Sequence, residues 1–316
     1  DLKFYAVDNV GNVEVVSNRK FTVDATPPVS QHKINGPSVN QTLAPKAEIV
    51  LSAKDKLTGI GTIKYSIDGG QEVVYNEPIS LSDLNDGKHE LVFYATDNLG
   101  LEEDKTKHKM SFYLDLYPPE IDLSIDGSKY QSDGFLFIPE SSKLKVSASD
   151  NHSGVDKIFY QVTHEGPDTK EKTPLTEYKN GISFSKNGKK TIMVKAFDKI
   201  GNEMRRNKVL YLDKEKPKTG IKYGKPQIFN NDTLYITLST KVTLFTTKYD
   251  SGVKHTKFSI NGGQEKIYNG NNLTFNSEGI YRVQYYSEDN VGNTENKKTA
   301  QFAIDNTPPR VELVVL

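Results

Sequence analysis

The feature that most limits what this chain can fold into is a block of eleven residues that occurs four times. The copies are FYAVDNVGNVE at 4–14, FYATDNLGLEE at 93–103, VKAFDKIGNEM at 194–204 and YYSEDNVGNTE at 285–295. Each copy is followed by a short apolar segment and then by an aspartate that precedes proline, namely Asp24, Asp115, Asp213 and Asp305. The intervals between these aspartates are 91, 98 and 92 residues, which is the length of one small β-sandwich domain. The chain of 316 residues is therefore a tandem repeat.

Two further sequence features recur at matched distances from this block. A second block marks the middle of each complete repeat and begins SAKDKLTGIG at Ser52, SASDNHSGVD at Ser147 and TTKYDSGVKH at Thr246. A glycine also lies ten residues ahead of the aspartate in the first block, as Gly87, Gly188 and Gly279. Three landmarks at matched spacing indicate that each repeat is one folded unit.

Apolar and polar residues alternate within the repeats, which is the period of a β-strand. The strand ahead of the DNxGN turn carries Leu91, Phe93 and Ala95, and the same phase recurs in the other repeats. A shift of one residue would turn each of these sets to solvent, so the shared phase predicts one core in each repeat. No helical period is present, and the predicted fold class is all-β.

The central repeat contains seven short strands separated by turn-forming residues. They are predicted at 120–125, 143–149, 157–162, 175–178, 182–185, 190–197 and 208–212. Seven strands in about a hundred residues predict a Greek-key sandwich of the immunoglobulin-like type, and three such units predict an elongated array.

The repeat boundaries divide the chain into five parts. We predict the last two strands of an immunoglobulin-like domain at 1–24, complete repeats at 25–115, 116–213 and 214–305, and the first strand of a further repeat at 306–316. A strand pair or a single strand does not form a core alone. The end segments are therefore expected to be completed either by further parts of a longer chain or by neighbouring copies.

These residues resemble bacterial immunoglobulin-like tandem repeats of cell-surface and secreted proteins. The resemblance rests on YSIDGG at 65–70, the Asp86-Gly87 pair, FYATDNLG at 93–100 and an aspartate before Pro-Pro. Repeats of this type include some that are labelled outer-membrane β-barrel repeats of spirochaetes. The resemblance implies an extracellular, bacterial, multi-domain surface protein and no catalytic role, because such arrays serve as stalks, spacers or adhesins.

Composition excludes several classes of function. Lysine plus arginine and aspartate plus glutamate are both 41, so the chain lacks the positive footprint of a nucleic-acid-binding protein. No apolar run approaches the roughly 20 residues of a membrane-spanning helix. The absence of cysteine excludes disulfides and thiol chemistry, and the six histidines lack the spacing of a zinc site. No catalytic motif is present, so we predict no enzyme and no organic cofactor.

Aspartates at the repeat ends predict candidate calcium sites. In a Greek-key sandwich the turns after the second and sixth strands lie at one end, where the preceding linker arrives. This places Asp24, Asp55 and Asp97 together, and likewise Asp115, Asp150 and Asp198. Calcium prefers six to eight oxygen ligands, often several carboxylates. The tight-turn interpretation is favoured over the ion, because Asp commonly holds turns through hydrogen bonds from its side chain to nearby backbone and because Lys248 replaces the corresponding aspartate in the third repeat. We therefore predict no bound metal and keep calcium as the minority hypothesis.

Other acidic and aromatic residues allow two interpretations. Tyr5, Tyr94 and Tyr286 lie opposite the core phase of the sixth strand, so they form either an exposed platform for sugars or neighbouring chains, or cross-strand packing that stabilises the sheet. Glu102 and Glu103 have the adjacency of a carboxylate pair, but their place in a hairpin turn favours a solvated turn over a glycosidase dyad.

Three functions follow as hypotheses. The first is a structural stalk, spacer or adhesin segment, in which Pro-Pro linkers produce a semi-rigid rod on the order of 100 Å from three stacked sandwiches. The second is a self-assembling extracellular fibre or sheath subunit completed by neighbouring copies. The third is a glycan-binding accessory region of a secreted enzyme. The expected partners are neighbouring repeats, further copies of the chain, or a host or glycan ligand.

Overall fold

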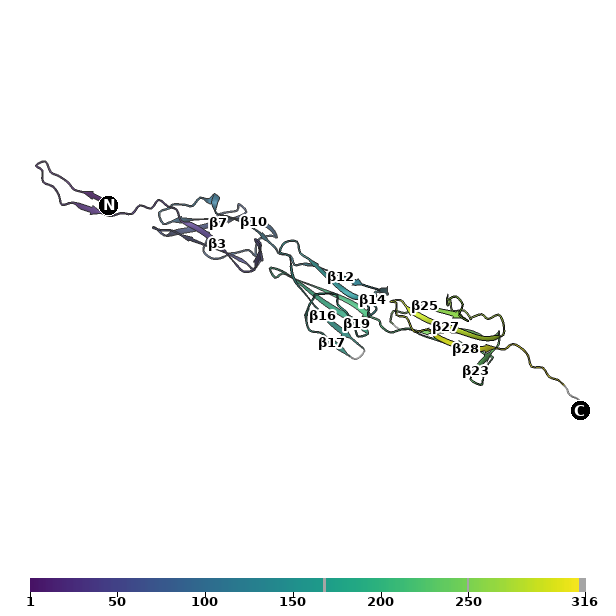
Figure 1. The fold of residues 1–316 in the computed structure, drawn as a ribbon. Coiled ribbons are helices and arrows are strands. Elements are labelled where there is room, and N and C mark those ends of the chain that lie inside the picture. The colour runs from purple at the N-terminus through teal and green to yellow at the C-terminus, as the bar shows by residue number, and fades with distance from the viewer. Residues whose placement is uncertain (167–168, 249, 313–316) are drawn as a thin grey trace. The chain divides into compact units, whose positions relative to one another are not determined.

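The computed structural model describes residues 1–166, 169–248 and 250–312. These residues form β-strands, and the one helical element among them is a single 3₁₀ turn at Lys105–Lys107 (Figure 1). The predicted all-β class is confirmed. The described residues contain no helix with the length and apolar character needed to cross a membrane. The chain forms two compact units, which comprise Asp1–Glu120, Ser149–Asp156 and Phe197–Met204, and Ile121–Ala148, Lys157–Ala196 and Arg205–Leu316.

The first complete repeat contains two sheets, and the chain passes repeatedly from one to the other. One sheet has the order β3–β6–β9 (Val29–Asn35, Glu48–Lys54, Ile79–Ser80). The other has the order β4–β5–β11–β10–β7–β8 (Ser38–Val39, Thr42–Leu43, Lys109–Leu114, Gly87–Asp97, Ile60–Ile67, Val73–Val74). The β5–β11 pair is parallel, and the other neighbouring strands in these two orders are antiparallel. This is the Greek-key arrangement of an immunoglobulin-like sandwich.

The core of this repeat lies between the two sheets. Ile49 and Leu51 contribute from β6, Leu91 and Phe93 from β10, and Leu114 from β11, and all five are almost fully buried. These side chains alternate along their strands with exposed or half-exposed neighbours, except that Tyr94 beside Phe93 is also buried. The period read from the sequence therefore places the correct face inside. The predicted phase is confirmed.

The middle strands repeat this plan. One sheet pairs β12 (Glu120–Asp126) with β15 (Lys143–Ser149). The other has the order β13–β14–β20–β19–β16–β17, with β18 also on β16 (Tyr130–Ser132, Phe135–Ile138, Glu203–Leu212, Gly188–Asp198, Val155–Glu165, Lys170–Lys172, Thr176–Glu177). The β13–β14 hairpin was not predicted. Its signal is the Asp133-Gly134 pair, whose φ angles of 51° and 80° suit a tight hairpin turn.

The strand predicted at 182–185 is reduced to a bridge between Ile182 and Leu144. These two residues exchange both backbone hydrogen bonds, at 3.0 and 2.8 Å, and the residues after Ile182 are not in a strand. The buried side chain of Phe184 still follows the predicted alternation. The apolar pattern therefore located the core face correctly and overstated the length of backbone pairing.

The third repeat has the same two sheets. They have the orders β21–β24 (Lys218–Tyr223, Val242–Thr247) and β22–β23–β28–β27–β25–β26 (Gln227–Asn230, Thr233–Ile236, Lys298–Ile304, Gly279–Asp289, Val253–Ile260, Lys266–Ile267). Leu244, Val283 and Phe302 lie at the centre of its core. The parallel β23–β28 pair matches β5–β11 of the first repeat.

The end segments differ from the complete repeats. Residues 1–24 contain β1 (Leu2–Phe4) and β2 (Ser17–Arg19), paired antiparallel, and apolar side chains such as Phe21 and Val23 are exposed there. Residues 306–312 are not in a strand, and residues 313–316 of the predicted first strand lie outside the described residues. The predicted domain boundaries stay a prediction.

Candidate metal centre

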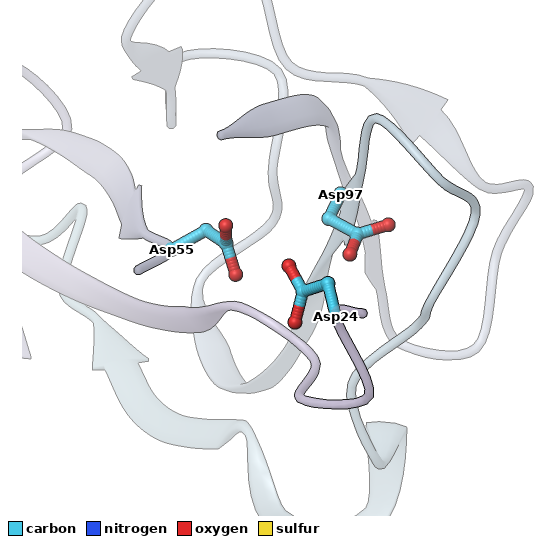
Figure 2. Close-up of side chains that lie close together, drawn as sticks. All are labelled: Asp24, Asp55 and Asp97. Atoms are coloured by element: carbon cyan, nitrogen blue, oxygen red, sulfur yellow. The ribbon is translucent and has the colours of Figure 1, made fainter. Parts of the chain in front are cut away.

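The first carboxylate cluster consists of Asp24, Asp55 and Asp97. Asp24 lies before the prolines that lead into the first complete repeat, Asp55 follows β6, and Asp97 is the last residue of β10. One oxygen from each carboxylate lies within 4.8 Å of the other two. Figure 2 shows the three carboxylates turned toward one another. The convergence predicted from the sequence is confirmed.

The turns use only one oxygen of each turn aspartate. Asp55 Oδ1 accepts the backbone N–H groups of Leu57, Thr58 and Gly59 at 2.7–2.9 Å. Gly59 makes the tight return possible because its φ of 79° is in the left-handed region. The N–H of Gly59 is the largest cause of a lowered pKa of the Asp55 carboxyl, and the N–H of Thr26 has the same effect on the pKa of Asp24. Both carboxyls therefore stay charged near neutral pH.

A hydroxyl group lies between two members of this cluster. Thr58 Oγ1 is 2.9 Å from Asp24 Oδ2 and 3.1 Å from Asp97 Oδ2. A hydroxyl carries a single hydrogen, so it satisfies one of these oxygens at a time. The Thr58 hydroxyl thus satisfies part of the hydrogen-bonding capacity of the first cluster without offsetting its charge, and sequence reasoning did not identify Thr58.

The second carboxylate cluster consists of Asp115, Asp150 and Asp198, and it lies within the first compact unit. Asp115 follows β11, Asp150 follows β15, and Asp198 is the last residue of β19. One oxygen from each again lies within 4.8 Å of the others, as predicted. Asp115 and Asp198 are only 1% and 2% exposed, so this cluster is more deeply buried than the first.

One oxygen in the second cluster has no partner. Asp198 Oδ1 accepts the backbone N–H groups of Ile200, Gly201 and Asn202 at 2.6–3.0 Å. Asp198 Oδ2 is buried and has no hydrogen-bond partner. A buried polar atom without a partner carries a free-energy cost of about 1–3 kcal/mol, and more when the group is charged. The turn explains one oxygen of this side chain and leaves the other unexplained.

The lysine cluster of the third repeat consists of Asp213, Lys248 and Asp289. Lys248 lies 35 residues after Asp213, as Asp150 lies 35 residues after Asp115. Its Nζ is 2.7 Å from Asp213 Oδ1 and 3.6 Å from Asp289 Oδ2. The Lys248 side chain is 1% exposed, and the side chains of Asp213 and Asp289 are 0% exposed. An ammonium group therefore lies between the two carboxylates at the place where the other repeats have a third aspartate.

The backbone around the linker aspartate is the same in both buried clusters. Asp115 Oδ2 accepts the N–H of Ser153 at 3.2 Å, and Asp213 Oδ2 accepts the N–H of Ser251 at 3.0 Å. The main-chain carbonyl of each linker aspartate also accepts a hydrogen bond from a turn asparagine, at 3.1 Å from Asn202 Nδ2 and 2.9 Å from Asn293 Nδ2. Sequence reasoning missed these asparagines, although both occur in the repeated block.

The tyrosines of the sixth strand are not a uniform exposed platform. Tyr94 is only 1% exposed, so the prediction that it faces solvent is wrong. Its hydroxyl donates to Glu72 at 2.7 Å, and Lys105 Nζ covers its ring at 4.0 Å. Burial is the main cause of the raised pKa of Tyr94. Tyr286 repeats this pattern with Glu265 and Lys297 but stays half-buried, whereas Tyr5 is 57% exposed.

Glu103 is a structural residue, and the solvated turn predicted for it is wrong. It is 5% exposed, and its two oxygens accept the N–H groups of Ser30 and Ala95, each at 2.6 Å. It therefore ties the first strand of the repeat to the sixth. Glu295 does the same for Thr219 and Ser287 in the third repeat. Each glutamate lies six residues after the aspartate of the repeated block, which is the signal that sequence reasoning overlooked.

The comparisons with known proteins give a distant likeness to tandem-domain structures. Neither a protein-family model nor a curated protein matches the sequence. A tetra-tandem repeat in the extending region of a large adhesion protein is 16% identical, with 96% of this chain and 80% of that chain covered and a TM-score of 0.34. Extracellular cadherin domains 3–6 of protocadherin gamma B2 are 12% identical, with 96% and 82% covered and a TM-score of 0.31. Domains A168–A170 of titin are 13% identical, with 88% and 99% covered and a TM-score of 0.32. Likeness at these TM-scores carries no argument about function.

Proposed function

We propose that this chain is a structural spacer or adhesin segment of a bacterial extracellular surface protein, in which repeated sandwiches separate other parts of the molecule. The sequence resemblance to bacterial immunoglobulin-like repeats supports the bacterial and extracellular setting. The proposal assigns no catalysis to the chain. Its function is mechanical, because a spacer needs modules that fold reliably and connections that restrict bending.

The burial of the linker aspartates is the observation that supports this proposal best. Asp115 and Asp213 are 1% and 0% exposed, and each accepts hydrogen bonds from the turns of the repeat that follows it. A flexible linker keeps its polar groups solvated. Here the carboxylate and carbonyl of the linker are bonded to protein, and this favours a restricted connection.

Solution scattering of the full chain tests the proposal. A compact globule of 316 residues has a radius of gyration of about 20 Å. A spacer made of successive sandwiches is expected to give a clearly larger value and a maximum dimension on the order of 100 Å or more. A variant with a flexible six-residue Gly-Ser segment inserted after Asp213 is expected to show a broader distribution of interatomic distances. A value near that of a globule, or no response to the insertion, would contradict a spacer.

A second candidate, a subunit of a self-assembling fibre, is favoured by the exposed apolar residues of 1–24. Phe4, Phe21 and Val23 are 47%, 63% and 72% exposed, and Phe4 lies in β1, a strand that pairs only with β2 among the described residues. A strand with a free edge and exposed apolar side chains can bind another chain by strand addition. Sedimentation and electron microscopy of the full chain distinguish the two functions. Fibres that disappear when residues 1–24 are deleted would support assembly, and a monomer at all concentrations would exclude it.

A further inference from the structure

We propose that Asp115, Asp150 and Asp198 bind one calcium ion. The three side chains supply only oxygen atoms, and one oxygen of each lies within 4.8 Å of the others. Calcium binds oxygen ligands at 2.3–2.6 Å, so a single ion between the three carboxylates is within reach of all of them. This inference concerns a ligand and does not depend on the proposed spacer function.

The unpartnered oxygen of Asp198 is the first observation that points to a cation. Asp198 is 2% exposed, and its Oδ1 already accepts three turn N–H groups while Oδ2 has no hydrogen-bond partner. Three carboxylates at this separation also repel one another, and burial strengthens the repulsion by reducing solvent screening. A bound cation satisfies the unpartnered oxygen and offsets the repulsion together.

The lysine cluster supplies the second observation. Asp213 and Asp115 are held by equivalent backbone bonds from Ser251 and Ser153. In the third repeat the ammonium of Lys248 lies between Asp213 and Asp289 at 2.7 and 3.6 Å. The same framework therefore holds a positive charge in the third repeat. The second cluster has an aspartate at that position, so its positive charge has to come from solution.

The chemistry of the ligands favours calcium over other biological cations. The cluster has neither histidine nor cysteine, which zinc and other transition metals prefer. Magnesium requires near-ideal octahedral geometry and gives up its bound water reluctantly, whereas calcium accepts irregular sets of six to eight oxygens. With three carboxylates and water completing the coordination, we expect a dissociation constant on the order of 0.1–1 mM, the range of extracellular calcium modules.

Calorimetric titration of the full chain with CaCl₂ after treatment with EDTA tests the site. The wild-type chain is compared with Asp198→Asn, which keeps the Oδ1 acceptor of the turn and removes the charge. We expect this variant to lose one calcium equivalent, or to bind it about tenfold or more weakly. Asp8→Asn is the matched control, because Asp8 accepts the same turn bonds from Val10 and Asn12 outside any cluster. It should bind calcium as the wild type does.

Asp150→Lys keeps the test decisive if Asp198→Asn folds poorly. This substitution copies the third repeat, so it should remove the same calcium equivalent and raise the melting temperature in EDTA. The proposal is overturned if the wild type binds no calcium at about 10 mM CaCl₂, which is about ten times the largest dissociation constant expected. It is also overturned if both variants bind as much calcium as the wild type, or if Asp8→Asn loses an equal amount.

Discussion

The second carboxylate cluster and the lysine cluster share one backbone framework and differ in the sign of one charge. In both, a buried linker aspartate accepts the N–H of a turn serine, and a turn asparagine donates to its carbonyl. Asp150 and Lys248 then occupy equivalent places. The third repeat carries an internal counter-ion, and the second cluster leaves Asp198 Oδ2 without a partner.

This difference shows that the backbone arrangement of the repeat is kept while the charge at one position changes. The turn glycines Gly154 and Gly252, with φ of 79° and 76°, fix the backbone in both places. The residue four positions before each glycine is Lys248 in the third repeat, where it pairs with the linker aspartate, and Asp150 in the second cluster, where we propose that a cation from solution takes this role. Under this proposal, one substitution changes the response of a repeat to ions while its fold stays the same.

The largest expected effect comes from removing the internal charge of the lysine cluster. Lys248→Met leaves Asp213 and Asp289 buried without a cation, and breaking a buried ion pair in this way costs about 3–5 kcal/mol. Hydrogen exchange of the amides of β27 and β28 in the full chain measures the loss. Lys254→Met is the matched control, because Lys254 pairs with Glu288 at the surface and is 54% exposed. Its effect should be below about 1 kcal/mol. Equal effects of the two substitutions would show that Lys248 has no special role.

The next largest effect is expected when the charge at position 248 is reversed. Lys248→Asp gives the third repeat the three carboxylates of the second cluster, so it should unfold more easily in EDTA and regain stability with calcium. When free calcium is a hundred times the dissociation constant, the recovery should be about 2.7 kcal/mol. Thermal unfolding with EDTA and with CaCl₂ measures it, and Lys248→Asn controls for the loss of the ammonium alone. Recovery of both variants to the same extent would contradict a created site.

The sequence predicted the clusters because their positions depend on repeat topology. The linker, the turn after the second strand and the turn after the sixth strand meet at one end of a Greek-key sandwich, so Asp115, Asp150 and Asp198 were placed together by counting strands. The orientation of each oxygen was beyond this reasoning, because a carboxylate in a turn uses one oxygen for the backbone. Whether the other is bonded depends on neighbours such as Thr58.

Burial of polar residues was the part that alternation predicted poorly. Tyr94 lies opposite the core phase and is nevertheless covered, because Glu72 and Lys105 come from distant parts of the repeat and close over its ring. Glu103 is buried because its carboxylate replaces missing strand-to-strand hydrogen bonds. Period-two patterns report which side of a strand a residue occupies, and they carry no information on what lies above that side.

A change in pH sharpens the comparison at the position of Lys248 in the first repeat, which is Asp55. The pKa of Asp55 is lowered from 3.8, chiefly by the N–H of Gly59. Its stabilising contribution is therefore present above about pH 3.8 and is lost as the pH falls through the lower folded-state pKa. We expect the exchange of the β10 amides, relative to their intrinsic rates, to accelerate as the pH falls below about 3.8 in the wild type. Asp55→Asn keeps the acceptor and removes the titrating charge, so it should lack this acceleration. Identical pH profiles would show that the turn does not stabilise the charged form.

The smallest expected effect tests what the two connections have in common. Asn202→Ala removes the hydrogen bond to the Asp115 carbonyl, and Asn293→Ala removes the bond to the Asp213 carbonyl. A neutral hydrogen bond contributes about 0.5–1.5 kcal/mol, so each substitution should cost about that much, irrespective of calcium. Asn293→Ala should cost slightly more, because the second bond of Asn293 Nδ2 is to the carboxylate oxygen Asp289 Oδ2 at 2.8 Å, whereas that of Asn202 Nδ2 is to the Tyr117 carbonyl at 3.4 Å. Thermal unfolding of both variants, with EDTA and with CaCl₂, provides the measurement. Asn202→Ala could instead have no effect with CaCl₂ and a large effect with EDTA. The asparagine hydrogen bond and bound calcium would then substitute for each other in stabilising this linker. Their contributions to stability would not be independent, which would contradict the comparison.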